Sequence, residues 1–293
     1  MEELHWTEEQ KKLAQAAVME RFASNSVAKQ FVPEVTVAWT ETTVRWNRFD
    51  FQRRMVNDNE TLGLFEPYAF VNLSRAQGDE ASLERAKTTL NRAASALARW
   101  HDALVFAGFD LKLNPKPPGI EMPPCEPTPI GLRQAAIQAE GENKSGPIPV
   151  DPQNANESLV AAVYEAVLRL EGFGYYRGYH LVLGQQLWRE LNSPNPGALV
   201  LPKDRIEPTL AGGGFYRTTT LPDTEAFVAS LDGPTFDCVT AGPPAEQPKL
   251  EFLRAQGDDR GEEIYKLRVR ERFAPRVREN RAVVRIVLGS AKK

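Results

Sequence analysis

The chain has 293 residues, of which 42% are apolar, and its formal net charge is −3 with acidic and basic residues interspersed. This length allows one large domain or two of ordinary size, and the charge excludes a strongly basic nucleic-acid-binding protein. Cys125 and Cys238 lie far apart in the sequence, which indicates neither a disulfide framework nor a zinc site. The sequence has no run of about 18 apolar residues and no export signal, so we expect a cytoplasmic protein without membrane contact.

A long amphipathic helix is predicted over residues 79–108, and the rest of the chain is expected to pack around it. Asp79 or Ser82 can cap its start, and Gly108 can end it because glycine tolerates a positive φ. At about 1.5 Å per residue, such a helix is roughly 40 Å long. Its apolar face carries leucines at seven-residue intervals, which are Leu83, Leu90, Leu97 and Leu104.

The residues before this helix predict a shorter helix and a β-arm. The shorter helix spans residues 7–22, with Thr7 as its cap, and residues 27–39 are extended. Over residues 40–71 a β pattern is interrupted by a polar turn at 56–60, as in a long two-stranded arm. Because an isolated two-stranded hairpin is marginally stable in water, we expect the arm to pack on a partner.

A proline-rich stretch, residues 112–156, follows the long helix and contains ten prolines. It is predicted to be a surface insertion or partly disordered, with one short helix at 131–140. The pattern then predicts helices at 157–170, 185–191 and 203–210 and strands at 179–183, 215–221, 226–231, 236–240, 250–255, 264–273 and 282–288. Because these elements lack a regular βαβ rhythm, the predicted class is α+β with a largely antiparallel sheet.

No catalytic or metal-binding constellation emerges from the sequence. The three histidines are His5, His101 and His180, and none lies near a pattern typical of a triad. The glycines at 212–214 precede a predicted strand, which favours a tight turn over a phosphate-binding loop. We therefore expect no enzyme, no cofactor and no metal, and a large core with a protruding arm favours a structural building block. Basic and aromatic residues interleave at 45–54, which leaves contact with nucleic acid as an alternative.

Several local strings, in their order along the chain, resemble the encapsulin shell proteins, which share the fold of tailed-phage major capsid proteins of the HK97 type. The last turns of the long helix resemble a family pattern in which His101 stands where an acid is usual. Ala28 and Lys29 stand where the family usually has glycine and arginine. The matching strings are residues 6–10, 28–32, 100–108, 179–191, 213–222 and 280–285.

This resemblance implies an HK97-like capsid fold whose copies assemble into a closed icosahedral shell. Its parts would be an N-terminal helix and the start of a peripheral domain (1–39), an extended β-arm (40–71), the peripheral-domain spine helix (72–108), an apical domain (109–225) and a β-rich return to the peripheral domain (226–293). The arm would lie over the adjacent subunit. Its expected contact residues are Trp46, Phe49, Phe51, Leu62 and Phe65.

The resemblance also implies a partner, because the N-terminal helix of encapsulins helps to form the pocket for a short C-terminal peptide of a cargo enzyme. By position, the candidates here are Leu13, Ala17, Lys29, Phe31 and Val32, and each has ordinary core packing as its alternative. The turn at 192–197 either lines a pore around a symmetry axis or is a plain surface turn. Its pore candidates are Asn192, Ser193 and Asn195, which would make the opening polar and uncharged.

Two other functions remain open at this stage. A viral or prophage capsid of the same fold would package DNA and reside in a virion. Seven basic residues near the C-terminus could then form a stripe toward packaged DNA, namely Lys266, Arg268, Arg270, Arg272, Arg276, Arg278 and Arg281. An isolated enzyme is the third possibility, and it would require a strongly perturbed catalytic group in a closed pocket.

Overall fold

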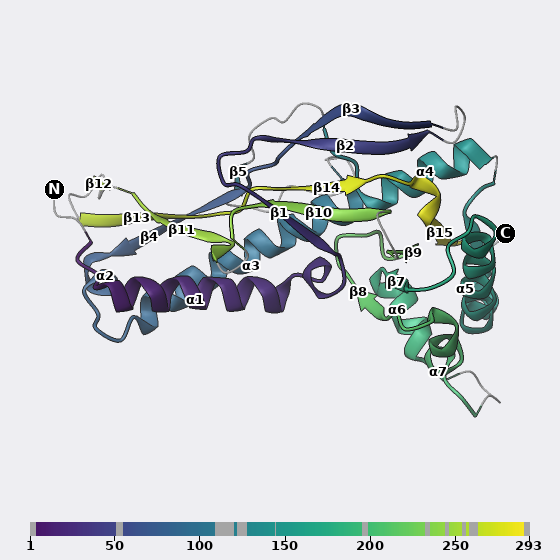
Figure 1. The fold of residues 1–293 in the computed structure, drawn as a ribbon. Coiled ribbons are helices and arrows are strands. Elements are labelled where there is room, and N and C mark those ends of the chain that lie inside the picture. Colours follow the sequence, from purple (N-terminus) through teal and green to yellow (C-terminus); the bar gives the residue numbers. More distant parts are fainter. Residues whose placement is uncertain are drawn as a thin grey trace.

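The computed structural model describes residues 4–50, 55–108, 120–121, 128–143, 145–194, 199–231, 235–243, 246–253, 256–257 and 263–289. The molecule is elongated, with α1 (Glu8–Asn25) along one long edge and the hairpin of β2 (Thr43–Asp50) and β3 (Met55–Gly63) along the opposite edge (Figure 1). At one end lies α5 (Ala155–Gly172), surrounded by shorter helices and strands.

The spine is α3 (Glu84–Ala107), and its buried face organises the larger core. The four leucines predicted for that face are at most 1% exposed. The helix ends at Gly108, whose φ is +77°. Its start differs from the prediction, because neither Asp79 nor Ser82 caps it. Leu83 at the cap position has φ +57°, and the Glu80 carboxylate accepts a hydrogen bond from the Arg85 N–H at 3.2 Å.

Helix α1 lies beside α3 and runs in the same direction. Thr7 caps the helix as predicted, and it forms a capping box with Gln10, in which each side chain bonds the other residue's backbone N–H. Ala14, Val18 and Phe22 are buried at four-residue intervals and form the face of α1 that packs on α3. No described element covers the opposite face of α1, where Leu13 is exposed.

Three sheets complete the part of the molecule around α3. The hairpin β2–β3 forms the first. The second pairs β1 (Glu34–Val37), β10 (Phe236–Ala241) and β14 (Phe273–Val277). The third pairs β4 (Tyr68–Ser74), β5 (Ile120–Glu121), β11 (Lys249–Phe252), β12 (Gln256–Gly257) and β13 (Glu263–Arg270). A short helix, α2 (Arg75–Gly78), links β4 to the segment before α3.

The part around α5 has its own sheet and a second core. The sheet order is β6 (Ile148–Val150), β15 (Val283–Leu288), β9 (Glu225–Ser230), β7 (Tyr179–Leu183) and β8 (Phe215–Arg217). Further helices are α4 (Leu132–Asn143), α6 (Gln185–Asn192) and α7 (Pro202–Ile206). Leu159, Val163, Val167 and Leu170 of α5 are buried, as their spacing predicts. The expected boundary at residue 226 falls within this sheet, because β9 and β15 both pair inside it.

The arm is shorter than predicted and is built differently. Residues 56–60 are part of β3, which pairs with β2, so the predicted polar turn is wrong. The connection between the strands falls on 51–54, outside the described residues. Residues 68–71 belong to β4, which pairs with β13 rather than with the arm.

The strand predicted at 264–273 is also two strands. β13 ends at Arg270, and the chain changes sheets at Phe273, which exchanges two backbone hydrogen bonds with Phe65 at 2.7 and 2.9 Å. The short helix expected at 131–140 is present as α4. Most of the remaining proline-rich stretch up to residue 127 lies outside the described residues.

Candidate assembly and docking surfaces

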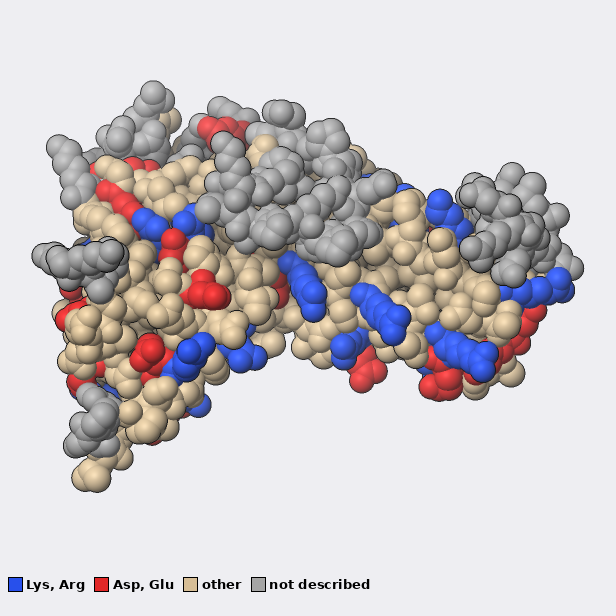
Figure 2. Space-filling model, turned by 180° about the vertical axis from the view of Figure 1, so that it is seen from behind, with Lys and Arg blue, Asp and Glu red and all other residues tan. Residues whose placement is uncertain are grey.

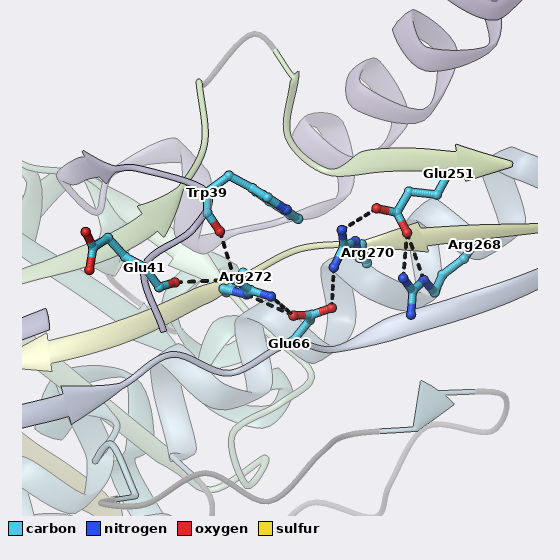
Figure 3. Close-up of polar contacts among 7 residues, drawn as sticks. All are labelled: Trp39, Glu41, Glu66, Glu251, Arg268, Arg270 and Arg272. Carbon is cyan, nitrogen blue, oxygen red and sulfur yellow. Dashed lines mark hydrogen bonds and ion pairs between the residues drawn. The ribbon is translucent and has the colours of Figure 1, made fainter. Parts of the chain in front are cut away.

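The base of the arm is fixed by a ladder of ion pairs between the segment after β3 and the C-terminal strands (Figure 3). The Glu66 carboxylate accepts hydrogen bonds from Arg270 Nη1 at 2.6 Å and from Arg272 Nε at 2.8 Å. Partial burial opposes ionisation of Glu66, but these bonds outweigh it and lower the pKa of the carboxyl. Arg272 Nη1 also donates to the Trp39 carbonyl at 2.8 Å. The arm therefore leaves the subunit from a rigid root.

The basic residues near the C-terminus that were considered for DNA contact have partners inside the subunit. Arg268 and Arg270 pair with Glu251, and Arg276 and Arg278 each lie 2.8 Å from an Asp237 oxygen. Lys266 lies 4.3 Å above the ring of Phe70, and Arg281 lies 4.0 Å from Glu142. Because the six arginines have carboxylate partners within the subunit and Lys266 lies on an aromatic ring, the predicted stripe is not a free basic surface.

The arm side chains fall into two groups. Leu62 and Phe65 are 1% and 0% exposed inside the subunit, so they stabilise the arm root and are not available to a neighbour. Trp46 is half-buried, and its Nε1 donates to the Val277 carbonyl at 2.7 Å. Phe51 and the side chain of Phe49 lie outside the described residues. The exposed apolar arm residues are Met55 and Val56, at 51% and 58%, which sequence analysis had missed because Val56 fell in a predicted turn.

The end of α1 is held by a buried polar cluster. The Asp102 carboxylate accepts hydrogen bonds from Ser26 Oγ and from the N–H groups of Val27 and Ala28, at 2.8 to 3.0 Å. Burial raises the pKa of Asp102, and these three bonds oppose the rise. This cluster fixes the direction in which the chain leaves α1.

Lys29 joins a second part of this cluster. Its ammonium pairs with Glu34 and lies 3.4 Å from Glu271, whose side chain is fully buried and whose other oxygen is 3.0 Å from His101 Nδ1. Burial works against the ionised form of Glu271, but His101 and Lys29 lower its pKa. Lys29 thus compensates a buried carboxylate.

The five residues expected to bind a cargo peptide do not share one surface. Lys29 is engaged as described, Val32 is 6% exposed in the core, and Phe31 stacks on Tyr216 with 4.1 Å between ring centroids. Leu13, by contrast, is 54% exposed on the uncovered face of α1, with Ala17 one turn further on. These two line a groove between α1 and α3 that also contains Ala16, Glu20, Arg21, Ser24, Lys87 and Asn91.

A second groove flanks α1 on the side of β11. It is mainly apolar and is rimmed by basic side chains, and its lining is Lys11, Lys12, Gln15, Ala16, Met19, Glu246, Lys249, Leu250 and Phe252. The uncovered face of α1 is therefore accessible from both sides. Sequence periodicity could have suggested this, because Leu13 and Ala16 lie off the buried stripe.

The pore candidates lie at the end of α6. Asn192 is exposed, and its Nδ2 donates to the Trp188 carbonyl at 2.8 Å. Ser193 Oγ donates to the Arg189 carbonyl at 2.7 Å. Both side chains therefore satisfy the last carbonyls of their own helix. Asn195 lies outside the described residues.

Within the described ranges, no group of three or more metal-ligating side chains is present. The described helices include none that is long and apolar enough to cross a bilayer. Cys238 is a buried free thiol, and its burial raises its pKa. These observations supply no candidate active site in the part of the chain that the structure describes.

Comparison with known proteins bears directly on this architecture. Residues 132–242 match the family model described as "Encapsulating protein for peroxidase". The virus-like particle protein of Pyrococcus furiosus superposes with a TM-score of 0.68 at 12% identity, covering 97% of this chain and 100% of that one. The chain has the fold of encapsulin and HK97-type capsid shell proteins.

Both branches of that fold are represented. Mycobacterium phage Adephagia matches with a TM-score of 0.62 at 13% identity over 92% of each chain. The SrpI encapsulin of Synechococcus elongatus matches with a TM-score of 0.53 at 11% identity, over 90% of this chain and 89% of that one. No curated protein matches the chain in sequence. The resemblance noted from the sequence and the α+β HK97-like class are thus confirmed.

Proposed function

We propose that the chain is the structural subunit of a closed icosahedral protein compartment in the cytoplasm. The observation that carries this proposal is the match of residues 132–242 to a family of encapsulating proteins, in a chain whose whole fold is that of shell subunits. The arm supports it, because the β2–β3 hairpin exposes Met55 and Val56 beyond a rigid root. When a neighbouring subunit covers these apolar side chains, the free energy of the assembly falls.

The compartment encloses a cargo enzyme through a short peptide that binds at the uncovered face of α1. Leu13 and Ala17 contact this peptide, and the apolar groove toward β11 gives a further surface. Lys29, Phe31 and Val32 act from beneath by holding the end of α1 in place. Asn192, Ser193 and Asn195 line the opening through which small solutes pass, with weak charge selection because none of them is ionised.

A DNA-packaging viral or prophage capsid is the second candidate, favoured by the match to the phage structure over 92% of each chain. Against it, the C-terminal arginines are ion-paired within the subunit. Neighbouring genes separate the two: a peroxidase, ferritin-like protein or other enzyme with a short C-terminal tag supports the compartment. Portal, protease and terminase genes support the capsid, and the protein would then reside in a virion.

The test is size-exclusion chromatography of the purified protein with negative-stain imaging and absorbance at 260 and 280 nm. Uniform closed particles without nucleic acid support the compartment. Particles that contain nucleic acid favour the capsid. A monomer or small oligomer contradicts both shell functions. Co-expression of the neighbouring tagged enzyme with wild type and Leu13→Asp then tests the α1 face, since a buried carboxylate there opposes binding of an apolar peptide.

A further inference from the structure

A row of arginines lies along the exposed face of the spine helix. Arg85, Arg92 and Arg99 are spaced by seven residues, so they share one face of α3. All three are exposed, and Figure 2 shows a line of separated basic side chains along this face of the molecule. Within the described residues, no carboxylate pairs with any of them. This differs from the C-terminal strands, whose arginines form ion pairs with Glu66, Glu251 and Asp237.

Two of these arginines line a groove between α1 and α3 that has no acidic wall. Its lining is Arg21, Thr88, Asn91, Arg92, Ser95, Ala96 and Arg99. Arg21 Nε donates to Ser95 Oγ at 2.9 Å, which steers its guanidinium along this wall. The guanidinium groups of Arg92 and Arg99 give the groove N–H donors and positive charge.

This basic groove continues into the groove at Leu13 and Ala17, whose lining mixes apolar and polar side chains. Arg21 and Asn91 line both, so the two form one channel along the α1–α3 seam. One end offers Leu13, Ala16 and Ala17, with Glu20 and Lys87 as its charged members, and the other end offers Arg92 and Arg99. An extended chain that runs along the seam in the direction of α1 meets Leu13 and Ala17 first and the basic end second.

The distance between Arg92 and Arg99 limits which ligand can contact both of them. Arg92 and Arg99 are separated by about 10.5 Å along the helix axis, at 1.5 Å per residue. An extended peptide rises about 3.3 Å per residue, so carboxylates three positions apart can reach both guanidinium groups. Arginine binds carboxylates with paired N–H donors, which gives geometric as well as charge selection.

We propose that the channel between α1 and α3 binds an acidic peptide, in which apolar residues contact Leu13 and Ala17 and carboxylates three positions apart contact Arg92 and Arg99. This inference rests on the proposed function and adds the charge of the targeting peptide to it. A nucleic-acid backbone fits less well, because one end of the channel places Leu13 and Ala17 beside the Glu20 carboxylate, and the chain as a whole carries a net charge of −3.

The experiment loads a fluorescent reporter into particles by co-expression with the full-length shell protein. The reporter carries at its C-terminus a short tag with two leucines followed by two glutamates three positions apart. Matched tags replace the glutamates with glutamine or with lysine. After size-exclusion chromatography, reporter fluorescence per particle is the readout. We expect the glutamate tag to exceed the glutamine tag by about twofold to thirtyfold, the range that two exposed ion pairs give, and the lysine tag to load least.

Two shell variants test whether Arg92 and Arg99 themselves contact the charged positions of the tag. Arg92→Gln/Arg99→Gln should remove the advantage of the glutamate tag, and Arg92→Glu/Arg99→Glu should reverse the order in favour of the lysine tag. Arg189→Gln/Arg217→Gln, which removes two exposed arginines near α6 and β8, is the control and should load like wild type. Reversal is informative because a purely structural role of these side chains would not exchange tag preference.

Three results would overturn the inference. Equal loading of all three tags, or best loading of the lysine tag in wild type, leaves the compartment intact but rejects the acidic peptide. Nucleic acid that copurifies with wild-type particles and disappears in Arg92→Gln/Arg99→Gln assigns the channel to phosphates instead. Absence of particles in wild type rejects the proposed function and this inference together.

Discussion

Lys29 gives the sharpest test of the buried cluster below α1. Replacement by methionine keeps the apolar stem but removes the ammonium, so that among the described residues the fully buried Glu271 keeps its contact with His101 Nδ1 at 3.0 Å. Breaking a buried ion pair by removing one partner costs about 3–5 kcal/mol, because the other charge stays desolvated. With an unfolding entropy of about 2.1 cal/mol/K per residue, a chain of this length should lose roughly 5–8 °C in Tm.

The sign of the pH dependence follows from Glu271. Its pKa is lowered in the folded protein, so its stabilising contribution is present above the unfolded value of about 4.3 and is lost as the pH falls through the folded value. Lys29→Met removes part of this contribution. The Tm difference between wild type and variant should therefore narrow as the pH falls below about 4, through the folded pKa of Glu271.

Calorimetry of wild type, Lys29→Met, Glu271→Gln and the double variant at one scan rate provides the assay. The double variant should be less destabilised than the two single losses combined, since neither charge is then left alone. Additive losses, or an unchanged Tm in Lys29→Met, would refute the assignment of Lys29 to the core. If Lys29→Met reduces cargo loading and leaves the Tm unchanged, Lys29 contacts the cargo peptide instead.

Three further predictions concern the arm, the end of α1 and one close contact. Val56→Asp should prevent or weaken particle assembly while far-UV circular dichroism stays unchanged, and Val56→Thr, which keeps the shape, should assemble more completely in sedimentation velocity. Asp102→Ala should lower stability by about 2–4 kcal/mol, because the Val27 and Ala28 N–H groups lose their acceptor; a loss below 0.5 kcal/mol in denaturant titration would contradict this role. Gly131→Ala should cost about 1–3 kcal/mol, since a Cβ would lie 2.2 Å from the Gly108 nitrogen; normal thermal stability would show that this contact relaxes freely.

Elements with a strong period were predictable from the sequence. The leucines of α3, the buried stripe of α5 and the cap at Thr7 all lie where the sequence pattern predicts them. Local rules decided these cases because each depends on residues three to seven positions apart. The fold class followed from the same elements together with the family resemblance.

Features that depend on distant residues were missed. The start of α3 is set by Glu80 and a left-handed Leu83, which no capping pattern indicates. The strand at 264–273 divides because Phe65, more than 200 residues earlier, pairs with Phe273. The C-terminal arginines alternate as in an exposed stripe, yet their partners Glu66 and Asp237 come from other segments. Side-chain pairing of this kind is a tertiary property.

Cargo-site residues illustrate the same limit. Leu13 and Ala17 share a helix face, and their spacing alone brings them to one groove. Lys29, Phe31 and Val32 follow closely in sequence, but the turn fixed by Asp102 directs them into the subunit. Arg92 and Arg99 reach the α1 groove from a helix some seventy residues away.

The most direct test of the account is a cryo-EM reconstruction of the purified protein. We predict a closed icosahedral shell in which the β2–β3 hairpin lies over a neighbouring subunit, with Met55 and Val56 covered by that neighbour, and with the α1–α3 channel facing the interior. Open or irregular oligomers, or a shell in which the hairpin contacts its own subunit alone, would contradict it.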